Sequence, residues 1–183
     1  HILLLPTVEV VDADVHDPAT LERLFAGADA VVSLVGVLHS LSGEPYGPGF
    51  ARAHVELPKK IVAACRQAGV KRLVHISALG ASADGPSEYQ RSKAAGEAAI
   101  RSTGADLDWV ILRPSVIFGR DDRFLNMFAR LAAVFPVLPL AGADARFQPV
   151  YVEDLAEVVW RSLITADAAG QSFDVAGPSV YTL

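Results

Sequence analysis

The chain of 183 residues has the length of one domain, and a hydrophobic content of 51% is enough for a buried core. A net charge of −5 and scattered Lys and Arg residues argue against a surface that binds nucleic acid or anionic membrane. One cysteine excludes an internal disulfide and fits a reducing compartment, the histidines lack metal-ligand spacing, and the apolar runs are too short for a transmembrane helix.

The N-terminal residues predict the end of one element followed by a strand. The apolar run 1–5 stops at Pro6 and has no helix-start signal, so we expect the chain to be a fragment of a longer protein. The segment from Thr7 to Val15 alternates and is rich in valine, which predicts a strand.

A helix and a buried strand are predicted next. Asp17 is a typical N-cap, Pro18 suits the first helical position, and Gly27 suits the end of the helix. Residues 29–37 are nearly all apolar, which is typical of a parallel strand covered on both faces.

Glycines and prolines then mark a loop at 38–49, which we expect to form a lid or a substrate rim. A long helix is predicted for 50–69, with Gly69 as its terminator. Pro58 should either kink this helix or mark its true first turn. A strand at 71–77 follows.

The remaining sequence continues the alternation of helices and strands. We expect helices at 87–103, 121–134 and 153–165, and strands at 108–113, 147–151 and 173–176. Gly104 should end the first of these helices, and Pro114 should break the strand at 108–113. We interpret the whole chain, 1–183, as one incomplete domain in which 120–150 is a partial substrate-side insertion.

Strands that alternate with helices and are almost continuously apolar predict a doubly wound α/β fold with a mainly parallel sheet. Such sheets bind ligands at the carboxyl ends of their strands. The candidate binding residues there are Asp14, Val15, Leu34, Val35, Gly36, Val37, Ile76, Ser77, Ala78, Pro114, Ser115 and Val116.

Tyr89 and Lys93 are the candidate catalytic pair. Their spacing places the phenol and the ammonium on one helix face, about one turn apart. An ammonium near a phenol favours the phenolate, so we expect a lowered Tyr89 pKa, as a proton-transferring tyrosine requires. Ser77, at the end of the preceding strand, is expected to hydrogen-bond a substrate oxygen beside them. The alternative is a surface tyrosine and a solvated lysine on an amphipathic helix.

This arrangement resembles the Ser, Tyr-x-x-x-Lys site of the short-chain dehydrogenase/reductases. The resemblance to their extended and atypical branch covers essentially the whole chain, through VVDADVHD, ADAVVSLVGVL, KRLVHISALGA, SEYQRSKAAGEAAI, WVILRPSVIFG and FQPVYVEDLAEVV. Within that branch the chain is most similar to the accessory nicotinamide-nucleotide-binding subunit of respiratory complex I and its bacterial relatives. The resemblance implies a Rossmann-type domain, truncated at both ends, and a nicotinamide dinucleotide cofactor, with NADP favoured over NAD.

The resemblance also implies roles for individual residues. Asp14 and Val15 would lie beside the adenine, and Leu34, Val35, Gly36 and Val37 would pass beneath the adenosine ribose and pyrophosphate. Ser77, next to Ile76, would polarise a substrate oxygen, Tyr89 would exchange its proton, and Lys93 would hold the nicotinamide ribose. Pro114, Ser115 and Val116 would line the nicotinamide. Ordinary packing at the strand ends is the alternative for each of these residues.

The chain departs from the family pattern at its glycines. None of the fourteen forms G-x-x-G-x-x-G or G-x-G-x-x-G, the loop on which the pyrophosphate rests. In the family's strand order, two strands would lie between 7–15 and 29–37. We therefore expect these two segments to pair directly, to leave unpaired edges, or to recruit a partner, and we expect weak nucleotide binding by these residues alone.

Three functions remain open from the sequence. The first is an enzyme that transfers hydride to a carbonyl or from an alcohol, or performs redox epimerisation or dehydration, on a substrate the sequence does not identify. The second is a non-catalytic NADPH-binding subunit that serves the structure or assembly of complex I. The third is a regulatory nucleotide sensor. We expect a cytoplasmic location, peripheral to the inner membrane if the complex I resemblance holds.

Overall fold

The computed structural model describes residues 6–120, 122 and 145–182, and its centre is a parallel sheet. The four strands lie in the order β1 (Ala30–Ser33), β2 (Arg72–Ile76), β3 (Asp108–Pro114) and β7 (Gln171–Val175). Every neighbouring pair is parallel, with Val31 opposite Leu73 and Leu73 opposite Trp109. The predicted doubly wound α/β fold is confirmed.

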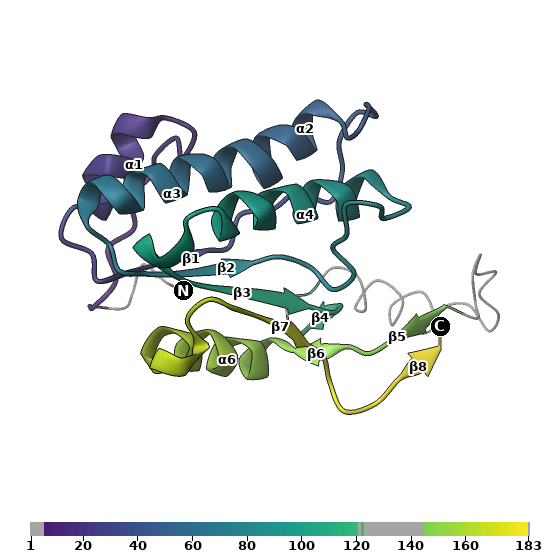
Figure 1. Cartoon of the computed structure of the whole chain (residues 1–183). Helices are drawn as coiled ribbons and strands as arrows, with labels where there is room; N and C mark the ends of the chain where they lie inside the picture. The colour runs from purple at the N-terminus through teal and green to yellow at the C-terminus, as the bar shows by residue number, and fades with distance from the viewer. Residues whose placement is uncertain (1–5, 121, 123–144, 183) are drawn as a thin grey trace.

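Helices cover both faces of this sheet (Figure 1). Helices α1 (Pro18–Phe25), α3 (Leu57–Ala68) and α4 (Glu88–Arg101) lie on one face, and α6 (Val152–Ile164) lies on the other. Successive residues of a strand point to opposite faces, so Leu73 enters the core under α3 whereas Val74 enters the core against α6. Both side chains are fully buried, as expected for a strand covered on both sides.

The helix-start signals act as the sequence predicts. The Asp17 side chain accepts hydrogen bonds from the N–H groups of Ala19 and Thr20, and Pro18 occupies the first helical position. Ser87 caps α4 in a capping box with Gln90. These caps fix where α1 and α4 begin.

The long helix predicted for 50–69 is three helical segments in succession. They are α2 (Pro48–Phe50), the π-helical η2 (Ala51–Glu56) and α3, which Gly69 ends at a φ of 73°. Pro58 marks the first turn of α3, which is one of its two predicted roles. A proline cannot donate to the carbonyl four residues earlier, and the wider π-helical turn lies where that bond would form.

The freed carbonyl, that of His54, meets helix α4 at Gly96. A Cβ at Gly96 would overlap the His54 carbonyl oxygen, so only glycine permits this approach of the two helices. The close approach brings the His54 turn against the face of α4 that carries the candidate catalytic pair.

The strand predicted for Thr7 to Val15 is wrong. The structure assigns neither strand nor helix there, and Val8, Val10 and Val11 are exposed. Strand β1 pairs with β2 on one edge, and within the described residues no strand pairs with its other edge. Direct pairing of 7–15 with β1, one of the three expected outcomes, is therefore contradicted, and the described residues leave this edge of β1 unpaired.

Other predicted strand limits also change. Strand β1 ends at Ser33, four residues early, and Leu34 to Val37 leave the sheet with exposed side chains. Pro114 does not break β3 but ends it, opposite Val175 of β7. The Pro114 carbonyl accepts the Leu79 N–H, so the segment after β2 stays bonded to the end of β3.

The C-terminal part adds two small sheets. Strand β4 (Ile117–Phe118) pairs in parallel with β6 (Val150–Tyr151), and β5 (Arg146–Phe147) pairs antiparallel with β8 (Tyr181–Thr182). The single strand predicted for 147–151 is thus two strands. Most of the predicted helix at 121–134 and of the insertion at 120–150 lies outside the described residues. Single-turn 3-10 helices, η3 (Gly104–Asp106) and η4 (Ala166–Ala168), precede β3 and β7.

In the described ranges, no helix combines the length and apolar character that a membrane crossing requires.

The contact at Gly96 predicts an inverted response to alanine. Helix propensity alone would favour Gly96→Ala by about 1 kcal/mol. Because the new Cβ would meet the His54 carbonyl, we expect the free energy of unfolding to fall instead, by about 1–3 kcal/mol. Urea denaturation would measure it, with Ala98→Gly at the exposed position two residues later as the control for propensity. A more stable Gly96→Ala protein would contradict the close approach.

Candidate functional site

The carboxyl ends of β1, β2 and β3 form one edge of the sheet, and helix α4 begins above that edge (Figure 1). The Lys93 Nζ donates a hydrogen bond to the Ile76 carbonyl at 3.3 Å and lies 5.8 Å from the centre of the Tyr89 ring. A Cβ built on Gly36 would lie 3.2 Å from the same Nζ. The structure therefore brings Gly36, Ile76, Tyr89 and Lys93 together, as the sequence predicts.

Burial determines the electrostatics of this group. Lys93 is only 5% exposed, and desolvation lowers its pKa to about 8 although the Glu97 carboxylate one turn later acts in the opposite direction. The Tyr89 pKa is raised, because burial penalises the phenolate. The expected lowering of the Tyr89 pKa is therefore contradicted. The ammonium lies over the face of the ring, where it does little to stabilise charge on the phenol oxygen.

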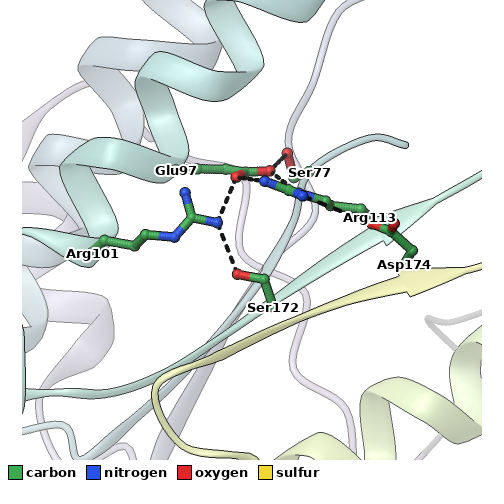
Figure 2. A network of polar contacts seen from close by, with 6 residues as sticks. All are labelled: Ser77, Glu97, Arg101, Arg113, Ser172 and Asp174. Atoms are coloured by element: carbon green, nitrogen blue, oxygen red, sulfur yellow. Dashed lines mark hydrogen bonds and ion pairs between the residues drawn. The ribbon is translucent and has the colours of Figure 1, made fainter. Parts of the chain in front are cut away.

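A buried carboxylate, Glu97, anchors α4 to the sheet (Figure 2). Arg113 of β3 donates to it from Nε and Nη2 at 2.8 and 2.6 Å, and Arg101 forms an ion pair with it at 2.8 Å. Arg101 also donates to the Ser172 hydroxyl of β7 at 2.9 Å. Burial alone raises the pKa of Glu97, but the hydrogen bonds from Arg113 and Ser77 outweigh it, so the pKa lies below its ordinary value.

Ser77 belongs to this anchor. Its hydroxyl donates to Glu97 Oε1 at 2.6 Å, and the side chain is buried at the end of β2. A hydroxyl has one proton to donate, so in this arrangement Ser77 can accept a hydrogen bond from a ligand but cannot donate one. Its expected role of polarising a substrate oxygen requires the Glu97 bond to be given up.

His54 joins the segment after β1 to α4, and sequence reasoning missed it. Its Nε2 accepts the Val37 N–H at 3.0 Å, and its Nδ1 lies 2.9 Å from the Ser92 hydroxyl. The ring stacks on Phe50 and meets the Tyr89 ring edge-on, with centres 5.4 Å apart in each case. No spacing in the sequence signals these contacts, because Val37, His54 and Ser92 come from three different elements.

The other candidate binding residues occupy the ends of strands and loops. The Asp14 carboxylate accepts the His16 N–H at 2.8 Å, and Val15 packs against the core under α1 and α3. Ser115 donates its N–H to Val175, and Val116 accepts the Val150 N–H. The structure thus places Asp14 and Val15 in local contacts, whereas Pro114, Ser115 and Val116 connect β3 to its neighbours.

The site fits part of a dinucleotide. A buried ammonium, a glycine beside it and the exposed segment Leu34–Val37 offer a cation and accessible backbone at the edge where such sheets bind nucleotides. The glycine-rich loop that would hold the pyrophosphate is absent from the sequence. The described residues therefore offer a cation and accessible backbone, without a glycine-rich loop beside them.

Two models of known protein families match this chain. A family model described as NAD(P)H-binding matches residues 3–125, and a model of the RmlD substrate binding domain matches 81–177. The chain is 36% identical over 172 residues to the mouse protein "NADH dehydrogenase [ubiquinone] 1 alpha subcomplex subunit 9, mitochondrial", covering 93% of this chain and 44% of the mouse protein.

A second curated relative is the ceramide reductase of Caulobacter vibrioides, 36% identical over 149 residues, which cover 81% of this chain and 45% of that protein. The chain therefore spans less than half the length of these relatives. Among solved structures it is similar to a dTDP-glucose 4,6-dehydratase from Streptomyces venezuelae with NAD bound, at a TM-score of 0.83 and 23% identity, covering 99% of this chain and 62% of that one. A UDP-glucuronic acid 4-epimerase from Bacillus cereus gives a TM-score of 0.82 at 17% identity, with 98% and 63% covered. At such identities these structures support the fold.

The Glu97 anchor predicts a large loss of stability in Glu97→Gln. The substitution removes the charge that compensates Arg113 and Arg101 in a buried site, so we expect the free energy of unfolding at pH 7 to fall by about 3 kcal/mol. The matched control is Glu157→Gln, which breaks the exposed pair with Arg161 and should cost less than about 1 kcal/mol.

The same variants predict a pH dependence. Because the folded pKa of Glu97 is below the ordinary value of 4.5, its contribution is complete above pH 4.5 and is lost as the pH falls through the folded value. Urea unfolding at pH 7 and at pH 3 should therefore show a smaller pH effect in Glu97→Gln than in the unaltered protein. Equal pH effects in both proteins would contradict a stabilising role of the Glu97 charge.

Proposed function

Because the chain belongs to the NAD(P)H-binding family of short-chain dehydrogenase/reductase-like proteins, we propose that the protein is an NAD(P)-dependent oxidoreductase or redox epimerase/dehydratase whose catalytic pair is Tyr89 and Lys93. The observation that carries the proposal is the buried Lys93 ammonium, held by the Ile76 carbonyl beside Gly36 and the Tyr89 ring. Burying a cation costs free energy unless the cation is paired with a bound ligand or with another group of the protein.

The protonation state of Tyr89 favours the reductive direction. With its pKa raised by burial, the phenol keeps its proton at neutral pH and is ready to donate it. The bound nicotinamide would supply a hydride to a carbonyl carbon. Tyr89 would give its proton to the carbonyl oxygen, so that the product is an alcohol, and would then regain a proton from solvent. Lys93, still charged at neutral pH, would hold the hydroxyls of the nicotinamide ribose.

Ser77 and the strand-end segments have supporting roles in this proposal. Leu34 to Val37 would lie along the nucleotide, Ile76 would position Lys93, and Pro114, Ser115 and Val116 would border the nicotinamide. Asp14 and Val15 would reach the adenine. Ser77, which donates to Glu97, would accept a hydrogen bond from the hydroxyl of an alcohol substrate or product. The cofactor is a nicotinamide dinucleotide, with NADP proposed over NAD, and the substrate is a small carbonyl or alcohol.

A second candidate is a non-catalytic NADPH-binding subunit of respiratory complex I. The 36% identity to the mouse complex I protein over nearly the whole chain supports it. In that case the nucleotide would stabilise the fold, and the protein would lie peripherally at the inner membrane. The mouse relative and the ceramide reductase are equally identical to this chain, so the choice between the candidates is an experimental one.

Substitution of the phenol separates the two candidates. In the protein at its natural length, we expect Tyr89→Phe to lower the rate of NADPH-dependent carbonyl reduction at least about a hundredfold, since it removes the general acid. NADPH affinity should change little. Reduction of a panel of aldehydes and ketones would be followed by NADPH absorbance, with Tyr46→Phe in the loop before α2 as the control. Equal, negligible rates in all three proteins, with NADPH still bound, would favour the subunit.

The Lys93 pKa of about 8 predicts a pH limit for nucleotide binding. The ammonium is present below this value and lost above it, so NADPH affinity should decline as the pH rises from 7 to 9.5. Lys93→Arg, which stays charged, should show no such decline, and Lys93→Met should bind weakly throughout. Fluorescence titrations would measure the dissociation constants. A decline of the same size in Lys93→Arg would assign the pH limit to another group.

A further inference from the structure

The His54 ring lies between two parts of the proposed site. It is 1% exposed, and it packs between Phe50 and Tyr89 on the face of η2 that meets α4. On one side it contacts the backbone after β1, and on the other it contacts Ser92, the residue before Lys93. One side chain therefore connects the segment proposed to carry the nucleotide with the helix proposed to carry the chemistry.

The hydrogen bonds around the ring specify a single neutral tautomer. Nε2 must have a free lone pair because it accepts the Val37 N–H at 3.0 Å. Nδ1 must then carry the proton and donate it to the Ser92 hydroxyl at 2.9 Å. Ser92 is free to accept it, because its own proton goes to the Tyr89 carbonyl at 2.8 Å. Each donor in the series thus has an acceptor: Val37 donates to His54, His54 donates to Ser92, and Ser92 donates to the Tyr89 carbonyl.

The surroundings keep the ring neutral. Desolvation, followed by the nearby Lys93 ammonium, lowers the His54 pKa to about 4, and the bond from Val37 does not reverse this. At neutral pH His54 is therefore uncharged and holds these hydrogen bonds. It behaves as a fixed brace and not as a proton carrier.

The hydrogen bond from the Val37 N–H distinguishes His54 from a ring that only fills space. Phenylalanine could fill the gap between Phe50 and Tyr89, but it has no acceptor for the Val37 N–H. Val37 follows Gly36, where an added Cβ would lie 3.2 Å from Lys93 Nζ and 3.6 Å from His54 Nε2. A small shift of Val37 would therefore alter the spacing between Gly36 and the Lys93 ammonium.

We propose that His54 is a positioning residue for nucleotide binding: it fixes the Gly36–Val37 backbone at the distance from Tyr89 and Lys93 that the dinucleotide requires. This inference rests on the proposed function, because it assumes that Leu34–Val37 carries the nucleotide. The fixed acceptor on His54 would hold the Gly36–Val37 backbone in one conformation before the nucleotide binds. Less conformational entropy of this segment would then be lost on binding.

Three substitutions separate the two hydrogen bonds of the ring. A glutamine amide reaches about as far as Nε2, so His54→Gln can still accept the Val37 N–H. An asparagine amide reaches about as far as Nδ1, so His54→Asn can keep the Ser92 bond and loses the Val37 bond. His54→Phe keeps the aromatic packing and loses both bonds. The glutamine variant is therefore the matched control for the other two.

The experiment measures two quantities in the protein at its natural length. NADPH dissociation constants come from fluorescence titration, and the exchange rate of the Val37 amide comes from NMR without nucleotide. We expect His54→Asn and His54→Phe to bind NADPH about tenfold more weakly, as one lost hydrogen bond implies. Their Val37 amides should exchange at least about tenfold faster. His54→Gln should stay within about threefold in both quantities.

Each alternative outcome contradicts a different statement. If His54→Phe binds NADPH like the unaltered protein, or if its Val37 amide stays protected, His54 only fills space and the inference is wrong. If His54→Gln is as impaired as His54→Asn, the Val37 bond is not the cause and the inference also fails. If the unaltered protein binds no NADPH while its Val37 amide is protected, the proposed function fails along with the nucleotide role, and only the brace itself remains.

Discussion

The position of helix α4 over the sheet depends on the compensation of one buried charge, the Glu97 carboxylate. Glu97 is fully buried, and a carboxylate in such a place must be matched by donors. Its donors come from the end of β2, from β3 and from the next turn of α4, and Arg101 extends the set to β7 (Figure 2). Because these partners belong to three strands, α4 has little freedom to slide or rotate over the sheet. Lys93 lies about one turn and Tyr89 about two turns before Glu97 on the same helix, so both side chains are held in place with it.

The sequence predicted best where local signals and burial agree. The Asp17 and Ser87 caps, the Gly69 terminator and the apolar strands β2 and β3 each depend on a few adjacent residues. The strand expected at 7–15 failed for the opposite reason. Its alternation is real, but a strand exists only through a neighbour, and the described residues provide none for it. An alternating sequence shows that a segment is able to form a strand, but a neighbouring strand is needed for it to do so.

Predictions for the candidate site also succeeded where they depended on local spacing and failed where they depended on the tertiary fold. The spacing of Tyr89 and Lys93 predicted that both face one edge of the sheet, since helix geometry relates them directly. The Tyr89 pKa was mispredicted because spacing indicates that two groups are near, whereas burial and the direction from ammonium to phenol oxygen decide the sign. His54 and Glu97 could not be found from the sequence, because their partners come from separate strands and loops. Contacts that depend on the tertiary fold leave no local pattern.

The π-helical segment η2 has an evolutionary implication. A π-helical turn contains one residue more than an α-helical turn, so η2 is equivalent to an α-helix with a single-residue insertion. Removing one residue between His54 and Leu57 would rotate the residues before the deletion by about 100° relative to α3. The imidazole would then leave the sheet edge altogether. A one-codon change in this helix could therefore disconnect the two halves of the site while every secondary-structure element stayed in place.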